Sequence, residues 1–130
     1  MRRASPEILV VDDDPDMLEV VAAVLHGAGY PVRTARNGQE ALEAVATSMP
    51  ALVLLDMLMP VMDGWQFARE LHARHGHDTP IVVLTAAEHA RARAEEVGAA
   101  DVISKPFDLH HFLKVVARHT RAAPDVRPIV

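Results

Sequence analysis

The sequence contains no cysteine, no long apolar run and no excess of positive charge. Without cysteine, neither a disulfide framework nor a thiolate metal site is possible. No apolar run approaches the length of a membrane-spanning helix, and the N-terminal residues MRRASPE lack the apolar core of a secretory signal. The formal net charge of −5 argues against nonspecific binding of nucleic acid. We therefore expect a cytoplasmic protein that contacts neither membrane nor nucleic acid directly.

Length and composition are those of an ordinary soluble globular protein. The chain has 130 residues, of which 50% are hydrophobic and 24% are charged, so one domain with a substantial core is the simplest organisation. We place this domain at residues 1–120. The remaining residues, RAAPDVRPIV, contain two prolines and little periodicity, which indicates a C-terminal tail or linker stub at 121–130.

Short apolar runs alternate with amphipathic stretches along the chain. The runs are residues 8–11, 31–35, 51–56, 81–86 and 101–105. Four of them are nearly continuous, which is typical of strands buried on both faces, whereas PVRTA at 31–35 alternates as an edge strand would. Strands that alternate with helical patterns indicate parallel pairing through right-handed crossovers, and therefore a three-layer α/β sandwich.

Polar residues stand at the C-terminal ends of four of these runs. They are Asp12 and Asp13, Asp56, Thr85 and Lys105. Because the C-terminal ends of parallel strands lie at one edge of a sheet, where ligands bind, we expect these side chains to converge. Three clustered carboxylates would repel one another, and their pKa values would rise, unless a cation lay among them. Oxygen ligands in a small site favour Mg²⁺.

The third carboxylate of the run Asp12 to Asp14 has a different explanation. Asp14 precedes Pro15, a favourable first helical residue, and Asp16 adds negative charge to the first turn. This pattern predicts that Asp14 is the N-cap of a helix. Asp12 and Asp13 remain as the functional pair, against the alternative of a solvated loop.

Four motifs carry a resemblance to a known family: VVDDDP, LLDMLMPVMDGW, VVLTA and SKPF, in this order. Over residues 7 to about 120, the chain resembles the receiver domain of bacterial two-component response regulators. The resemblance implies a flavodoxin-like (βα)5 fold with a parallel five-stranded sheet of strand order 2-1-3-4-5.

The resemblance also implies roles for individual residues. Asp56 would accept a phosphoryl group from a phosphohistidine of a sensor histidine kinase or of a histidine phosphotransfer protein. Asp13 and Asp56 would ligate Mg²⁺ together with the backbone carbonyl of Leu58, and Asp12 would hold metal-bound water.

Further positions would complete such a site. Thr85 would donate its hydroxyl group to one phosphoryl oxygen and Lys105 would pair with another, while the backbone N–H groups of Met57 and Ala86 would donate to the same group. In this family the peptide bond between the residues matching Lys105 and Pro106 is cis. The alternative for Lys105 is an ordinary surface ion pair.

Three positions depart from the family pattern. Val102 stands where the family often has an aromatic residue that swings inward, so we expect the switch to act through the backbone after Thr85 and through repacking of Val102. Leu58 and Ala87 lie at positions that influence hydrolysis in the family. Because neither side chain can hydrogen-bond a water molecule, we expect a long-lived phosphoryl group.

Other polar stretches have more ordinary interpretations. The segment HARHGHD at 72–78 is typical of a solvated helix end whose cations compensate the helix dipole, with a zinc site as the alternative. Residues 88–98 carry mixed charges and little apolar content, which indicates either a weakly anchored solvated helix or a mobile interaction helix. Asp63 is interpreted as a turn or cap residue, and Trp65 receives no chemical role.

The residues and the resemblance together predict a phosphoacceptor switch rather than a metabolic enzyme. Phosphorylation of Asp56 would remodel the face made by the fourth helix, fifth strand and fifth helix, which would then meet a partner or a second copy of the chain. We expect no DNA-binding or enzymatic output domain here, whether the chain is a single-domain regulator or a fragment of a longer protein.

Two competing functions share parts of this pattern. A phosphorylation-independent interaction module of the same fold would not need the full set of Asp12, Asp13, Asp56, Thr85 and Lys105. A Mg²⁺-dependent phosphatase with an aspartyl nucleophile usually has a second aspartate two residues after the nucleophile, where this chain has Leu58. The sequence therefore favours the phosphoacceptor switch over both.

Overall fold

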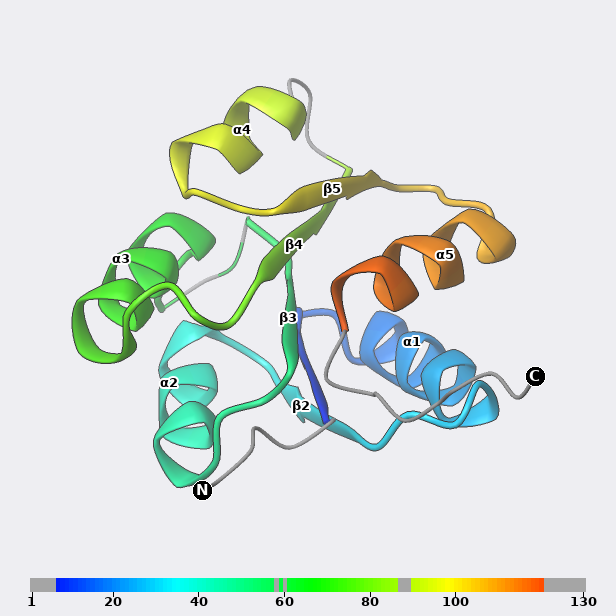
Figure 1. The fold of residues 1–130 in the computed structure, drawn as a ribbon, viewed down its shortest axis with the longest axis horizontal. Helices are drawn as coiled ribbons and strands as arrows, with labels where there is room; N and C mark the ends of the chain where they lie inside the picture. The colour runs from blue at the N-terminus through cyan, green and yellow to red at the C-terminus, as the bar shows by residue number, and fades with distance from the viewer. Residues whose placement is uncertain (1–6, 58, 60, 87–89, 121–130) are drawn as a thin grey trace.

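The five predicted strands form one parallel sheet in the order β2-β1-β3-β4-β5 (Figure 1). The computed structural model describes residues 7–57, 59, 61–86 and 90–120. The strands are β1 (Ile8–Val11), β2 (Val32–Ala35), β3 (Leu52–Leu55), β4 (Ile81–Thr85) and β5 (Asp101–Ser104). Every strand pairing is parallel, so the expected flavodoxin-like topology is confirmed. The tail predicted at 121–130 lies outside the described residues.

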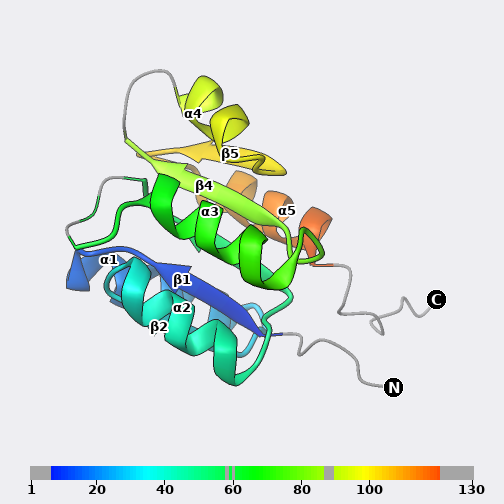
Figure 2. The same ribbon diagram turned by 90° about the vertical axis from the view of Figure 1, so that its left-hand side faces the viewer.

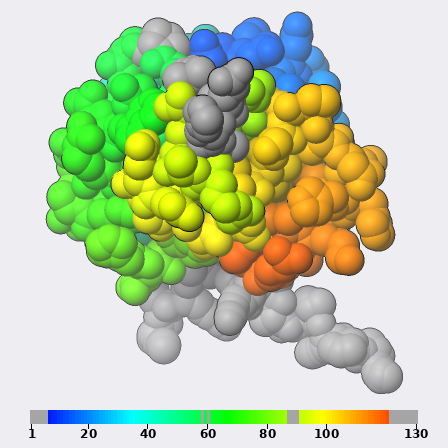
Figure 3. Space-filling model, turned by 90° about the horizontal axis from the view of Figure 1, so that it is seen from above, coloured from blue at the N-terminus to red at the C-terminus, as the bar shows by residue number. Residues whose placement is uncertain are grey.

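Five helices cover the two faces of the sheet. They are α1 (Pro15–Gly27), α2 (Gly38–Thr47), α3 (Gly64–His75), α4 (Ala90–Glu96) and α5 (Leu109–His119). Helices α2, α3 and α4 lie on one face, and α1 and α5 lie on the other (Figures 1 and 2). Seen from above, α4 lies between α3 and the β5–α5 side of the molecule (Figure 3). None of the described helices has the length and apolar character needed to cross a membrane.

Polar side chains at the helix starts explain where four of the helices begin. The side chain of Asp14 accepts from the N–H groups of Asp16 and Met17 at the start of α1, which confirms the predicted cap. Asn37, Asp63 and Asp108 cap α2, α3 and α5 in the same way. The interpretation of Asp63 as a cap residue is therefore also confirmed.

The continuous apolar runs supply two separate cores, one for each face of the sheet. In β1, Leu9 and Val11 belong to the cluster under α2, α3 and α4, whereas Ile8 and Val10 belong to the cluster under α1 and α5. Successive side chains of a strand point to opposite faces, so a strand covered on both sides must be apolar throughout. Burial of each such side chain contributes roughly 1.5–3 kcal/mol.

The two edge strands differ from the central ones, and β5 corrects one prediction. The alternating run at 31–35 was expected to form an edge strand, and β2 is indeed at the edge of the sheet. The run at 101–105 was expected to be buried on both faces. Only Ile103 of β5 is fully buried, because β5 forms the opposite edge of the sheet. A run of five residues with only two apolar side chains, Val102 and Ile103, does not distinguish these two positions.

Candidate functional site

Strand register brings Asp12 and Asp56 side by side at the C-terminal edge of the sheet. Val11 pairs with Leu55 in the parallel ladder between β1 and β3, so the residues that follow, Asp12 and Asp56, leave the two strands at the same level. The N–H group of Asp56 donates to the carbonyl oxygen of Val11 at 2.9 Å. The N–H group of Asp12 donates to the carbonyl oxygen of Ala35 in β2 at 3.1 Å. The backbone N–H groups of Asp12 and Asp56 are therefore both hydrogen-bonded to neighbouring strands.

Three carboxylates form a compact acidic cluster at this edge. One oxygen atom from each of Asp12, Asp13 and Asp56 lies within 4.8 Å of the other two. Asp12 and Asp56 are buried, at 2% and 8% exposure, whereas Asp13 faces solvent. At such distances like charges repel strongly unless positive charge lies nearby. The predicted convergence of these three residues is confirmed.

Lys105 brings positive charge to the cluster from the far edge of the sheet. Its Nζ atom lies 2.9 Å from Oδ2 of Asp12, and the side chain of Lys105 is only 17% exposed. The N–H group of Lys105 donates to the carbonyl oxygen of Thr85 at 2.9 Å, which extends the β4–β5 ladder by one residue. The peptide bond between Lys105 and Pro106 is cis. Lys105 does form an ion pair, but with a buried carboxylate of the cluster rather than with a surface group.

The second oxygen of Asp12 also has a donor. The N–H group of Asp14 donates to Oδ1 of Asp12 at 3.0 Å, while the side chain of Asp14 caps α1. A charge-assisted hydrogen bond on each oxygen holds the Asp12 carboxylate in one orientation. The run of three aspartates therefore divides into an oriented buried carboxylate, a solvent-facing carboxylate and a helix cap.

The remaining predicted residues that the structure describes lie at or just after the C-terminal ends of β3 and β4. Thr85 is the last residue of β4 and is 1% exposed, and Ala86 after it is exposed. Met57, which follows Asp56, is fully buried. Leu58 and Ala87 lie outside the described residues, so the predictions for them stay predictions.

A glycine at the start of α3 packs closely on Met57, the residue after Asp56. The N–H group of Gly64 donates to the carbonyl oxygen of Met57 at 3.0 Å. A Cβ atom on Gly64 would lie 2.7 Å from Sδ and 2.8 Å from Cα of Met57. Only glycine permits this approach, so the start of α3 packs directly on the residue next to Asp56.

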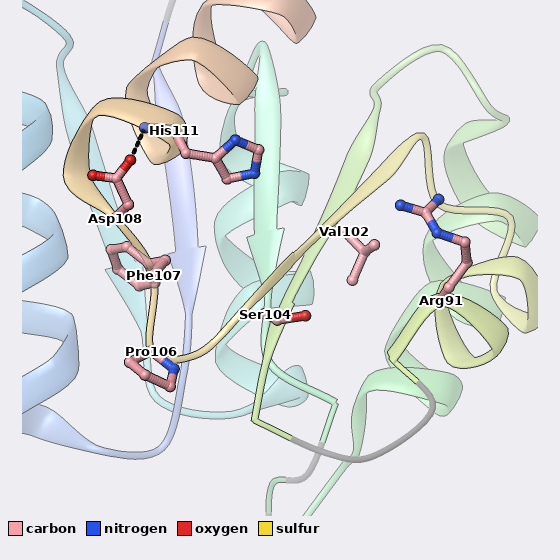
Figure 4. A pocket seen from close by; sticks show the side chains of 7 residues that line it. All are labelled: Arg91, Val102, Ser104, Pro106, Phe107, Asp108 and His111. Carbon is pink, nitrogen blue, oxygen red and sulfur yellow. Dashed lines mark hydrogen bonds between the residues drawn. The ribbon is translucent and has the colours of Figure 1, made fainter.

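A concave region lies between α4, β5 and α5 (Figure 4). Its lining residues are Arg91, Val102, Ser104, Pro106, Phe107, Asp108 and His111. Figure 4 shows Val102 between Arg91 on α4 and the start of α5. Val102, at the position where the family often has an aromatic residue, therefore lines a hollow on the face predicted to change on switching.

The histidines near the end of α3 form a contact that the sequence did not suggest. The rings of His72 and His77 stack with centroids 3.9 Å apart. Burial, and then the neighbouring His77, lower the pKa of His72. Within the described part of the chain, the aspartate cluster is the one group of three or more potential metal ligands close enough to share an ion. The zinc alternative for 72–78 therefore has no support there.

Comparison of the sequence with known families and proteins agrees with this geometry. The sequence model of the response regulator receiver domain matches residues 8–117. The response regulator MprA of Mycobacterium sp. (strain KMS) is 40% identical over 124 residues, which cover 93% of this chain and 54% of that protein. The chain thus spans about half the length of the curated relatives it matches.

Solved structures with the same fold include two that hold magnesium. The response regulator TrrA of Thermotoga maritima, in complex with Mg²⁺ and BeF, is 34% identical with a TM-score of 0.79, over 86% of this chain and 96% of that chain. The receiver domain of a sensor histidine kinase of Pseudomonas aeruginosa PAO1, with a magnesium ion coordinated in its active-site cleft, is 31% identical with a TM-score of 0.81. That alignment covers 90% of this chain and 98% of the other.

Proposed function

The chain belongs to the response regulator receiver domain family, and we propose that Asp56 is the residue on which it accepts a phosphoryl group. The donor is a phosphohistidine on a sensor histidine kinase or on a histidine phosphotransfer protein. The observation that carries the proposal is the position of Asp56, buried beside Asp12 and Asp13 at an edge that Lys105 also reaches. The chain would act as a switch that catalyses only its own phosphorylation and dephosphorylation.

The chemistry requires a positioned nucleophile and neutralised charge. A carboxylate oxygen of Asp56 attacks the phosphorus atom, and the O–P bond forms as the P–N bond to the donor imidazole breaks. The imidazole nitrogen leaves with the electron pair of that bond. Negative charge spreads over the three equatorial oxygens during transfer, so stabilisation of that charge is the main catalytic task.

Residues of the other strand ends would bind these oxygens. Lys105, which pairs with Asp12 at 2.9 Å, would transfer part of its interaction to one phosphoryl oxygen. The hydroxyl group of Thr85 would donate to a second oxygen, and the N–H groups of Met57 and Ala86 would donate to the same group. The hydrogen bond from the Lys105 N–H group to Thr85 O keeps these two strand ends in register.

The acidic cluster fits a hard divalent cation. Asp12, Asp13 and Asp56 offer carboxylate oxygens within 4.8 Å of one another, a donor set that suits Mg²⁺. We propose that these residues hold Mg²⁺ together with the backbone carbonyl of Leu58. The bound ion would supply positive charge near the transferring phosphoryl group. Lys105 pairs with one of the three carboxylates, that of Asp12, and the ion would bring further positive charge to the cluster.

Phosphorylation would be read out on the face formed by α4, β5 and α5. This face contains Val102 and Pro106 beside the hollow in Figure 4, and Lys105 connects it directly to the site. A shift of Thr85 and Lys105 toward the phosphoryl group would be transmitted through this short connection. The face would then bind a partner protein or a second copy of the chain.

The proposal is tested by intact mass after incubation with acetyl phosphate and Mg²⁺, beside Asp56→Asn and a metal-free sample. We expect one added phosphoryl group on the wild-type chain and none in the two controls. A folded wild-type sample that gains no mass and binds no beryllofluoride would overturn the proposal. The phosphorylation-independent interaction module would then be the better assignment.

A further inference from the structure

Trp65, the single tryptophan of the chain, connects the first turn of α3 to α4. Its indole Nε1–H group donates to Oε1 of Glu96 at 2.7 Å. The guanidinium carbon of Arg93 lies 5.2 Å from the centroid of the indole ring, which is within the range of a cation–π contact. Glu96 and Arg93 both belong to α4. One side chain of α3 therefore holds two side chains of the neighbouring helix.

The described side chains of helix α4 bury little apolar surface. It contains seven residues, and the buried apolar side chains over residues 91–97 are Ala94 and Val97. By comparison, α3 buries Phe67, Ala68 and Leu71. Figure 3 shows α4 on the outer surface of the molecule. A helix with so little buried apolar area depends strongly on its polar contacts for its position.

The other end of this connection is the residue after the proposed acceptor. Trp65 follows Gly64, whose N–H group donates to Met57 O at 3.0 Å and whose Cα packs on Met57 without room for a side chain. Met57 follows Asp56 in the chain. A displacement of the backbone at Asp56 and Met57 would therefore also displace Gly64 and, with it, Trp65.

We propose that Trp65, Glu96 and Arg93 form a latch that holds α4 in the position of the unphosphorylated state. The inference rests on the proposed function and adds to it the contacts that oppose switching. The latch stabilises the unphosphorylated arrangement, and its contacts break in the phosphorylated one. Loss of the latch then raises the population of the switched state without touching the acceptor site. Trp65 is a positioning residue here, since it acts through α4.

The test is the affinity of the chain for beryllofluoride with Mg²⁺, measured by calorimetry, in Glu96→Ala and in the matched control Glu95→Ala. Both glutamates are exposed and adjacent on α4, so the two variants change charge and helix propensity alike. An exposed polar contact is weak, so we expect Glu96→Ala to bind about two- to fivefold more tightly than wild type. Glu95→Ala should bind as wild type does.

A double-mutant comparison identifies Trp65 as the partner. Trp65→Phe keeps an aromatic ring but removes the indole donor, and we expect it to tighten binding in the same direction as Glu96→Ala. The double variant should show no further gain in affinity, because each single change already removes the same hydrogen bond. In the wild-type chain, beryllofluoride should also shift the fluorescence of Trp65 toward that of Glu96→Ala.

The possible failures are distinguishable. If the wild-type chain binds beryllofluoride and Glu96→Ala has the same affinity as Glu95→Ala, the latch is wrong and the proposed function stands. Additive gains in the double variant would equally overturn the latch, because the two residues would then act independently. If the wild-type chain does not bind beryllofluoride at all, the proposed function fails and the latch fails with it.

Discussion

Nζ of Lys105 lies 2.9 Å from Oδ2 of Asp12, although 93 positions of the chain separate the two residues. The ion pair joins the end of β5 to the end of β1 across β3 and β4. Asp12 is almost completely buried, and a buried carboxylate without a cation is costly. The pair therefore stabilises the fold and at the same time places an ammonium group at the acidic cluster.

Replacement of Lys105 by methionine should destabilise the chain. The change keeps most of the side-chain volume but leaves the buried Asp12 carboxylate without its cation, at a cost of about 1–3 kcal/mol. Urea unfolding without divalent cations measures the difference, and the loss should be smaller with Mg²⁺ because the ion supplies the missing charge. Lys114→Met, at an exposed position of α5, is the matched control. A Lys105→Met chain as stable as this control would contradict the argument.

Replacement of Asp13 by asparagine should stabilise the cation-free chain, whereas replacement of Lys105 should destabilise it. Asp13 adds a third negative charge beside Asp12 and Asp56, so its neutralisation should stabilise the cation-free chain by on the order of 1 kcal/mol. The same variant should lose most of the stabilisation that Mg²⁺ gives the wild-type chain. Thermal unfolding with and without Mg²⁺ measures both effects, with Glu19→Gln on the exposed side of α1 as control. If the Asp13→Asn chain without cations has a lower melting temperature than wild type, repulsion among the three carboxylates does not destabilise the fold.

Much of the fold and most of the acidic cluster could be predicted from the sequence. Central parallel strands are covered on both faces, so β1, β3 and β4 appear as uninterrupted apolar runs whose first polar residues mark the ligand-binding edge. The cap at Asp14 could be predicted because its hydrogen bonds are local. The strand order could not be predicted from periodicity and was inferred from the resemblance to the family.

Contacts between polar helix surfaces could not be predicted in this way. Trp65 and Glu96 are 31 positions apart, and nothing in the local pattern of either residue indicates the other. The stack of His72 on His77 and the exposure of β5 likewise depend on how whole elements pack. Such contacts follow from tertiary packing, and periodicity and capping rules describe only the local chain.

Asp101 should make stability depend on pH at the opposite end of β5. Burial raises the pKa of Asp101, but hydrogen bonds from His119, from the N–H group of Val102 and from Arg118 outweigh burial and hold it below its usual value. A carboxyl group whose pKa is lower in the folded than in the unfolded chain stabilises the fold at any pH above its unfolded pKa. This stabilisation is lost as the pH falls through the pKa of the folded chain. Asp101→Asn should therefore cost on the order of 1 kcal/mol at pH 7.

The pH dependence separates this effect from a simple loss of packing. The difference between wild type and Asp101→Asn should shrink as the pH falls below about 4, the ordinary pKa of an aspartate. Urea unfolding at pH 7, 5 and 3.5 measures this trend, with Asp78→Asn at an exposed loop position as control. A difference that stays constant over this range would show that the charge of Asp101 does not matter.

Addition of one methyl group at Gly64 should disturb both stability and the proposed acceptor loop. The new Cβ of Gly64→Ala would lie 2.8 Å from Cα of Met57, and a backbone atom cannot move aside as a flexible side chain can. We expect a loss of about 1–3 kcal/mol and slower labelling by acetyl phosphate, because Met57 adjoins Asp56. Gly27→Ala is the control, since Gly27 ends α1 with open space around it. That variant should be neutral or more stable by up to about 1 kcal/mol, and equal effects of the two substitutions would mean that the close packing on Met57 does not hold the loop.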